Sequence, residues 1–306
     1  YDFLLENVTY FRDPQQSRAK EKDLSWHPAY GNKLKSREGH IYQGTVLEHI
    51  LVQNLVQFFN VGEHNIMRLE NADWNDGLDM APQRGESVAF MSFYGGNFFG
   101  IADLLEHLAK VKKIDTIVVA QEVKILLDTS TKSACDYGSA EAKRDLLYQN
   151  YFNSVQPELS GAQEELSVVD IVKDLRRKGT WIFHHIKHHE IISIQDKQKS
   201  FTWFNGYYDN SGVCVEGKKE NRVWMTLTGQ VFAVMSGLAS EAETKNVIAS
   251  VERFLRDKKL GGYRLNTDFG LDHYLDLGRA FGFAYGTKEN GAFFSHMIVM
   301  YAYALY

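Results

Sequence analysis

Apolar residues recur at spacings of three and four along much of the chain, and this is the period of an amphipathic helix. Four stripes are clear: Val46, Leu47, Ile50, Leu51 and Leu55; Phe98, Ile101, Ala102, Leu105 and Leu108; Val168, Ile171, Val172 and Leu175; Val247, Ile248, Val251 and Leu255. Only four prolines interrupt the 306 residues. The pattern therefore predicts an almost entirely helical, all-α fold, which includes a buried helix over Met297–Tyr306.

Helix boundaries and loops organise the pattern further. Ser240 and Glu243 have the spacing of a capping box, which predicts a helix start at Ser240. Between the stripes lie long segments rich in Gly, Asn, Asp and aromatic residues, namely Glu70–Glu86, Trp203–Gly217 and Gly261–Asn290. Such long loops are uncommon unless they are functional. The sequence thus predicts one helical domain over residues 1–306, with elaborate loops at one end.

Composition excludes several classes of function. A formal net charge of −5 argues against sequence-independent binding to nucleic acid or to an anionic membrane, since both require clustered Lys and Arg. The apolar stretch Met297–Tyr306 is far shorter than the roughly 20 residues that span a bilayer. Two cysteines, Cys135 and Cys214, are too few for a disulfide framework and fit a reducing compartment. We therefore expect a cytoplasmic protein.

The first chemically informative segment is Asn71–Asp79, which contains three carboxylates and the indole of Trp74. Sugar hydroxyls need acceptors, sugar faces need a flat ring, and cleavage of a glycosidic bond needs a protonated carboxyl group. This segment offers all three. An Asx-rich turn that caps a helix is the alternative interpretation, and composition alone favours it.

The second segment is Gly286–His296, which leads into the last apolar stretch. Its glycines free backbone N–H groups, and Lys288 and His296 add donors beside a predicted helix N-terminus, where anions are favoured. Taken alone, a Lys and a His at such positions are more often surface and core residues.

Together and in this order, Asp73-Trp74-Asn75-Asp76-Gly77 and Lys288-Glu289-Asn290-Gly291…His296 resemble glycoside hydrolase family 94, the family of cellobiose, laminaribiose and β-1,2-oligoglucan phosphorylases. Three further segments fit the family: Arg84-Gly85-Glu86-Ser87-Val88, Gly206-Tyr207-Tyr208-Asp209-Asn210, and Gly229 to Gly237. The resemblance extends from about residue 40 to the end of the chain.

The resemblance implies an (α/α)6 barrel and a set of site residues. Asp76 would be the general acid and His296 would hold phosphate. Substrate-binding residues would be Asp73, Trp74, Tyr285, Lys288 and Glu289. Ala292 departs from the family, which commonly has a second Gly there. The chain would be a piece of a larger multidomain protein, without the family's N-terminal β-sandwich and its C-terminal segment.

The implied reaction is inverting phosphorolysis of β-linked gluco-oligosaccharides, which gives α-glucose 1-phosphate and a shortened sugar. Phosphate would be the co-substrate, and no cofactor would be needed. The expected partners are the oligosaccharide and phosphate, and a homodimer of the full-length protein is one assembly that this allows. Two alternatives stay open: an inverting β-glucan hydrolase that recruits Glu289 as its base, and a non-catalytic sugar-binding helical toroid.

A run of histidines raises the question of a metal site. His184 and His188, and likewise His185 and His189, lie one helical turn apart, and such pairs can chelate Zn²⁺ when a third ligand arrives. Nothing nearby in the sequence completes a site. We therefore predict a polar helix face and no metal.

Overall fold

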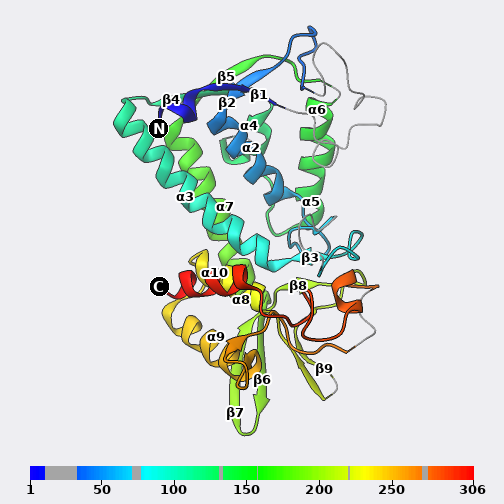
Figure 1. The fold of residues 1–306 in the computed structure, drawn as a ribbon. Helices are drawn as coiled ribbons and strands as arrows, with labels where there is room; N and C mark the ends of the chain where they lie inside the picture. Colours follow the sequence, from blue (N-terminus) through cyan, green and yellow to red (C-terminus); the bar gives the residue numbers. More distant parts are fainter. Residues whose placement is uncertain (11–32, 71–76, 131–133, 157, 220, 271–274) are drawn as a thin grey trace. The chain divides into compact units, whose positions relative to one another are not determined.

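The computed structural model describes residues 1–10, 33–70, 77–130, 134–156, 158–219, 221–270 and 275–306. The chain divides into two compact units (Figure 1). Unit 1 comprises residues 1–60 and 98–178, and unit 2 comprises residues 61–97 and 179–306. The dividing points fall inside two long helices, α3 (Val88–Lys112) and α7 (Val168–His189). The prediction of a single barrel domain over residues 1–306 stays a prediction.

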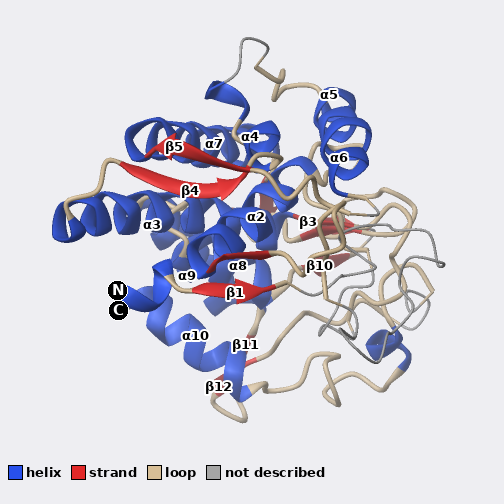
Figure 2. Ribbon diagram, turned by 90° about the horizontal axis from the view of Figure 1, so that it is seen from above, coloured by secondary structure: helices blue, strands red, loops and turns tan. Residues whose placement is uncertain are grey.

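Unit 1 is built around α2, whose buried face contains Leu47, Leu51 and Leu55. Its strands β4 and β5 pair antiparallel from Thr116 to Ala120 and from Gln163 to Ser167, and they lie side by side in both ribbon views (Figures 1 and 2). Apart from its shares of α3 and α7, its elements are η1 (Asp2–Leu5), β1 (Asn7–Thr9), β2 (Gln43–Thr45), α2 (Val46–Phe59), β4 (Thr116–Ala120), α4 (Val123–Leu126), η3 (Asp128–Ser130), α5 (Ala140–Asp145), η4 (Leu146–Phe152), α6 (Asn153–Val155) and β5 (Gln163–Ser167).

A buried carboxylate ties α2 to the strands of unit 1. The Thr45 hydroxyl caps α2 by accepting the Glu48 N–H at 3.0 Å. The Glu48 side chain accepts hydrogen bonds from the hydroxyls of Tyr10 and Tyr42 and from the N–H of Ala120. These donors allow a carboxylate to lie in the core, although burial still raises the pKa of Glu48.

Unit 1 also encloses an ion cluster, here called the Lys178 cluster. Lys178, Asp128 and Asp174 are all at most 1% exposed. The Lys178 ammonium is 2.8 Å from Asp128 Oδ1 and donates to Asp174, one helical turn earlier. Tyr137 and Thr129 donate their hydroxyls to Asp128 and Asp174 respectively, both at 2.7 Å. Every carboxylate of the cluster therefore has a cation and a neutral donor.

Unit 2 combines helices with short antiparallel strand pairs. The hairpin β6–β7 packs on α9, where the Ser250 hydroxyl donates to Thr202 O at 3.1 Å, and α10 packs on α8 (Figure 1). Apart from its shares of α3 and α7, its elements are β3 (Glu86–Ser87), β6 (Ile191–Asp196), β7 (Lys199–Phe204), β8 (Tyr207–Tyr208), β9 (Gly217–Lys219), β10 (Arg222–Trp224), α8 (Leu227–Met235), α9 (Glu241–Phe254), β11 (Arg256–Asp257), β12 (Gly262–Tyr263), η5 (Arg279–Gly282) and α10 (Ser295–Leu305).

The helices predicted from apolar spacing are confirmed. The four stripes lie on α2, α3, α7 and α9, and the last apolar stretch forms α10. The capping box at the start of α9 is present, because Ser240 Oγ accepts the Glu243 N–H while the Glu243 carboxylate accepts the Ser240 N–H.

The prediction of an almost purely helical chain needs correction. The described residues contain six two-stranded antiparallel sheets, and the predicted loops Trp203–Gly217 and Gly261–Asn290 include the short strands β8 and β12. The longest pair, β6–β7, turns at Lys197 and Gln198, which both have positive φ. Hairpin turns of this kind are recognised in sequences by Asn-Gly or Asp-Gly, and neither stands here.

Helix α3 has the length and apolar composition of a membrane span, and within the described residues it is the one helix that does. Half of its most apolar window is buried inside the protein. Phe98, Ala102 and Leu105 belong to this buried face. A core helix of a globular protein gives the same pattern.

Candidate functional site

A pocket in unit 2 gathers residues from the end of the first predicted site segment and from within the second. The empty space in and in front of the pocket is about 540 Å³, and this figure includes open solvent. The lining residues are Gly77, Leu78, Tyr207, Val215, Thr226, Thr228, Leu265, Asn266, Phe269, Leu277, Phe281, Glu289, Phe294 and Met297. Most of the lining is apolar, with a few polar groups among it, as is usual for small-molecule sites.

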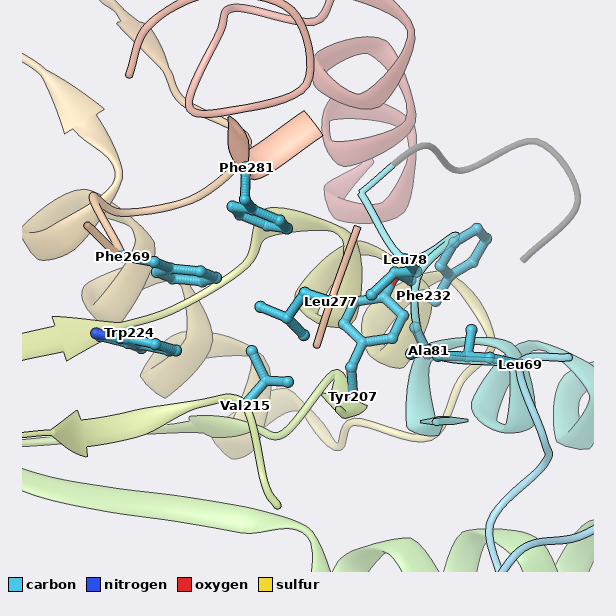
Figure 3. Close-up of a cluster of buried hydrophobic side chains, with 11 residues drawn as sticks. Leu69, Leu78, Ala81, Tyr207, Val215, Trp224, Phe232, Phe269, Leu277 and Phe281 are labelled. Carbon is cyan, nitrogen blue, oxygen red and sulfur yellow. The ribbon is translucent and has the colours of Figure 1, made fainter. Parts of the chain in front are cut away.

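The apolar wall is anchored by stacked aromatic rings. Phe269 stacks on Trp224 with ring centroids 4.5 Å apart, and on Phe281 at 5.2 Å, both pairs being nearly parallel (Figure 3). Leu277 and Val215 lie beside this stack in the same buried cluster. The rings support one another, so this side of the pocket is a fixed surface of flat apolar groups.

Two hydrogen-bonded contacts bring the segment after Asp76 to this wall. The Met80 N–H donates to Leu277 O at 3.0 Å. The Arg279 N–H donates to Asp79 Oδ1 at 2.9 Å, and the Arg279 guanidinium pairs with the same carboxylate. Gly77, the neighbour of the predicted acid Asp76, is consequently a lining residue.

Three predicted site residues, Asp73, Trp74 and Asp76, lie outside the described residues. Their roles, and the convergence of Asp76 with His296 on one cavity, stay predictions.

The segment with Lys288 and Glu289 is a tight turn. Lys288 has a φ of +51°, and the flanking Gly286 and Gly291 have φ of +93° and +68°. Lys288 is exposed, and its ammonium lies 5.9 Å from the centre of the Phe283 ring. Glu289 is partly buried and lines the pocket. Of these two predicted residues, only Glu289 is brought to the pocket by the described geometry.

Tyr285 packs against this turn. Its hydroxyl donates to Asn266 O at 3.0 Å, and the Arg264 guanidinium lies 5.2 Å from the centre of its ring. Arg264 also donates to Gly291 O at 2.7 Å and pairs with Asp257. Tyr285 is not among the lining residues, so its direct contact with a sugar stays a prediction.

The amide of Asn266 holds the same turn against the pocket. Its Oδ1 accepts the Gly291 N–H at 2.8 Å, and its Nδ2 donates to Asn290 Oδ1 at 3.2 Å and to Thr267 O at 2.8 Å. Asn266 is buried and lines the pocket. One side chain thus holds the two residues that follow Glu289, Asn290 and Gly291, in place.

A buried carboxylate, here called the Glu216 site, joins three segments behind the pocket. Glu216 accepts hydrogen bonds from the Trp203 indole at 2.7 Å, the Gly206 N–H at 3.0 Å and the Thr226 hydroxyl at 2.6 Å. All three donors are neutral. Burial raises the pKa of Glu216 to about 8, because these hydrogen bonds offset only part of the loss of solvation.

The predicted phosphate residue His296 lies in the first turn of α10. Its side chain is exposed, while its neighbours Phe294 and Met297 line the pocket. The first turn of a helix presents backbone N–H groups that lack intrahelical acceptors, and it favours anions. His296 itself is not a lining residue, so its contact with phosphate stays a prediction.

The sequence matches the family described as "Glycosyl hydrolase 94 superfamily, catalytic domain" over residues 29–139 and 180–304. This match covers most of the chain. The chain belongs to the glycosyl hydrolase 94 superfamily. No curated protein matches it.

The match to the glycosyl hydrolase 94 superfamily includes every lining residue of the pocket. It omits residues 140–179, which in the structure form α5, η4, α6, β5 and the start of α7. These residues are not an external addition, because Leu147, Leu175 and Lys178 are fully buried in unit 1.

The superfamily segment Arg84-Gly85-Glu86 has a structural place outside the pocket. The Glu86 carboxylate is fully buried and accepts the N–H groups of His64 and Ile66 as well as the His64 ring. The His64 ring stacks on Tyr208 with centroids 3.8 Å apart, and the Tyr208 hydroxyl donates to Glu190 at 2.9 Å. Burial raises the pKa of both carboxyl groups.

The histidine run does not assemble a metal site within the described residues. The rings of His184 and His188 stack at 3.8 Å, and His188 Nδ1 hydrogen-bonds to His184 O at 2.7 Å. No group of three or more His, Cys, Asp or Glu residues in the described part of the chain could hold an ion. Whether metal plays any part stays a prediction.

Sequence reasoning missed Tyr207, Thr226, Thr228 and Asn266 as pocket residues. The first three lie in or beside segments that fit the family, but nothing in their spacing indicates which hydroxyl faces a cavity. Asn266 stands alone between Leu265 and Thr267 in a predicted loop, where an Asn usually indicates only a turn.

Proposed function

We propose that this protein catalyses inverting phosphorolysis of β-linked gluco-oligosaccharides, within an (α/α)6 barrel that is part of a larger protein. One observation carries the proposal. In a chain of the glycosyl hydrolase 94 superfamily, Gly77, next to the predicted acid Asp76, and Glu289 line the same pocket. The superfamily supports a carbohydrate-active enzyme, and the pocket has the mainly apolar, partly polar lining that is usual for a small-molecule site.

The proposed reaction needs one acid and one nucleophile. Asp76 donates its proton to the glycosidic oxygen as the bond from that oxygen to the anomeric carbon breaks. An oxygen of phosphate attacks the same carbon from the opposite face, which gives α-glucose 1-phosphate and a shortened sugar. Phosphate is already an anion, so no carboxylate is needed to activate it. Asp76 must stay protonated near neutral pH, and the neighbouring Asp73 and burial would both raise its pKa.

The nucleophile needs an anion site, and two groups support one. His296 adds a donor to the first turn of α10, and the exposed Lys288 adds a cation to the turn that precedes it. Phosphate is then the co-substrate, and the reaction requires no cofactor. Both cysteines, Cys135 and Cys214, are free, which supports a cytoplasmic location.

An inverting β-glucan hydrolase is the second candidate, and the position of Glu289 favours it. A hydrolase needs a second carboxylate to activate water. Glu289 is a carboxylate that lines the pocket, so it could serve as that base. The two candidates differ in one requirement, which is phosphate.

The test uses the full-length protein with a panel of β-1,2-, β-1,3- and β-1,4-linked glucose disaccharides. We expect sugar release only with phosphate, with glucose 1-phosphate as a product, and release of free glucose when arsenate replaces phosphate. Asp76→Asn should abolish turnover and leave disaccharide binding, measured by calorimetry, largely intact. An equal rate in phosphate-free buffer would leave the hydrolase as the function.

A further inference from the structure

The hydroxyl of Tyr207 is a buried polar group without a hydrogen-bond partner among the described residues. Tyr207 is 2% exposed, and it is a lining residue of the pocket described above. In the close-up its ring lies between Leu277 and Phe232 and extends toward Leu78 (Figure 3). Leaving a buried hydroxyl unpaired is costly, so native structures usually supply a partner, a water molecule or a ligand.

The backbone around Tyr207 is held too firmly for the hydroxyl to find another partner by a small shift. Tyr207 pairs with Ser87 in the β3–β8 sheet. Gly206 is pressed against the first turn of α8, where a Cβ on Gly229 would lie 2.8 Å from the Gly206 Cα. The Glu216 site adds two hydrogen bonds, to the Gly206 N–H and to the Thr226 hydroxyl. The position of Tyr207 beside the start of α8 is thus fixed from three sides.

A second hydroxyl lies in the same region of the pocket. Thr228 is 8% exposed, lines the pocket and stands in the first turn of α8, where backbone N–H groups lack intrahelical acceptors. Burial and the nearby Glu216 carboxylate raise the pKa of the Tyr207 hydroxyl, and the Thr228 hydroxyl acts in the opposite direction, which makes the two hydroxyls neighbours. A phenol is protonated at neutral pH, so Tyr207 can donate. Around these two groups the wall is apolar, formed by Leu78, Val215 and Leu277.

We propose that the hydroxyls of Tyr207 and Thr228 form a polar niche that binds one hydroxyl group of the sugar in the pocket. A sugar hydroxyl both donates and accepts hydrogen bonds, which suits two protein hydroxyls. The C–H groups of the sugar ring suit the apolar wall. An anion fits less well, because the carboxylate Glu289 lines the same pocket. This inference rests on the proposed function and adds to it one specific contact, between the niche and a hydroxyl group of the substrate.

The first experiment measures thermal unfolding of Tyr207→Phe without any sugar. We expect a melting temperature equal to or above that of the wild type, because the change removes only an oxygen that has no partner. Tyr208→Phe is the matched control. Its hydroxyl donates to Glu190 outside the pocket, so this variant should melt at a lower temperature. A loss in Tyr207→Phe as large as in Tyr208→Phe would show that the Tyr207 hydroxyl is structural, and would overturn the niche.

The second experiment measures the binding of glucose and its 2-, 3-, 4- and 6-deoxy analogues. It uses calorimetry with the full-length protein, in buffer without phosphate. Wild-type protein should bind one analogue about 3- to 10-fold more weakly than glucose, and Tyr207→Phe should bind that analogue and glucose equally. Equal discrimination by both proteins would overturn the niche.

Binding without phosphate keeps the niche distinct from the proposed reaction. Cleavage that proceeds in phosphate-free buffer would overturn the phosphorylase alone, and the binding pattern would still support the niche. If the wild-type protein bound neither glucose nor the oligosaccharides, the niche and the proposed function would both fail. In steady-state assays, Tyr207→Phe should raise the KM for the sugar and leave the KM for phosphate unchanged.

Discussion

Two buried sites of this protein, the Lys178 cluster in unit 1 and the Glu216 site in unit 2, hold carboxylates in opposite ways. In unit 1, Asp128 and Asp174 share the buried cation Lys178, so negative and positive charges lie in contact. In unit 2, Glu216 is just as deeply buried, but an indole, a backbone N–H and a hydroxyl are its hydrogen-bond partners, and none of them carries charge. The first arrangement places each carboxylate against a cation, and the second surrounds its carboxyl group with neutral donors alone.

The difference predicts how each site responds to pH and to mutation. A buried ion cluster is sensitive to the loss of one partner, because the remaining charges are then buried without compensation. A carboxylate among neutral donors can instead take up a proton, and the pKa of Glu216, raised by burial to about 8, puts this near physiological pH. The Glu216 site lies behind the pocket, so its protonation state bears on the part of the protein that we propose to bind sugar.

The largest effect should come from Lys178→Met. The variant leaves Asp128 and Asp174 buried without a cation, and we expect a loss of about 3 to 5 kcal/mol in the free energy of unfolding. Urea denaturation measures it. Lys173→Met, an exposed lysine on the same helix, is the control and should change the free energy by less than about 0.5 kcal/mol. Similar stability of the two variants would mean that the cluster is not buried as described.

The second prediction concerns pH. The pKa of Glu216 is higher in the folded state than in the unfolded state, so the folded state retains a proton that the unfolded chain releases. This contribution to stability is fully present below about pH 4.5 and is lost as the pH rises to about 8. Between pH 6 and pH 8 the free energy of unfolding should fall by about 2 kcal/mol from this group.

Glu216→Gln should remove this slope. An amide has a single acceptor oxygen, so the variant should be less stable than the wild type at pH 6, and the difference should shrink or reverse by pH 8. Urea denaturation at pH 6, 7 and 8 gives the slopes. Glu241→Gln, at an exposed position on α9, controls for the loss of one negative charge. Parallel slopes in wild type and Glu216→Gln would assign the pH dependence to other buried groups, such as Glu86 and Glu190.

Asn266→Ala should affect stability less than Lys178→Met does. It removes two donors and one acceptor that hold the turn after Glu289, and we expect a loss of about 1 to 3 kcal/mol. Activity should suffer more than stability, because Glu289 would no longer be held at the pocket. Melting temperature and kcat/KM of the full-length protein separate the two effects. Thr287→Ala, in the same turn but exposed, removes one hydrogen bond, to Ala284 O, and should cost less stability than Asn266→Ala and leave kcat/KM unchanged. Equal losses in the two variants would contradict a positioning role for Asn266.

How much of the site could be predicted differs from residue to residue. Glu289 and the segment after Asp76 were found because their residue types are themselves the chemistry of glycosidic cleavage and because they stand in motifs of the glycosyl hydrolase 94 superfamily. Tyr207 could not be found in this way. The chain contains 16 tyrosines, and the buried cluster and the Gly206–Gly229 contact that distinguish this one exist only in the folded chain.

By itself the sequence determined the long helices, the cap of α9 and the family. Helix stripes and the Ser240–Glu243 box depend on contacts between residues three or four positions apart, and family motifs are local in the same sense. The tertiary structure alone decided the β6–β7 hairpin, the Lys178 cluster and the Glu216 site. The Lys178 cluster and the Glu216 site depend on the burial of polar groups from separate segments, such as Lys178 and Asp128, and burial is a property of the folded chain. The hairpin turns at Lys197 and Gln198, which carry no turn signature.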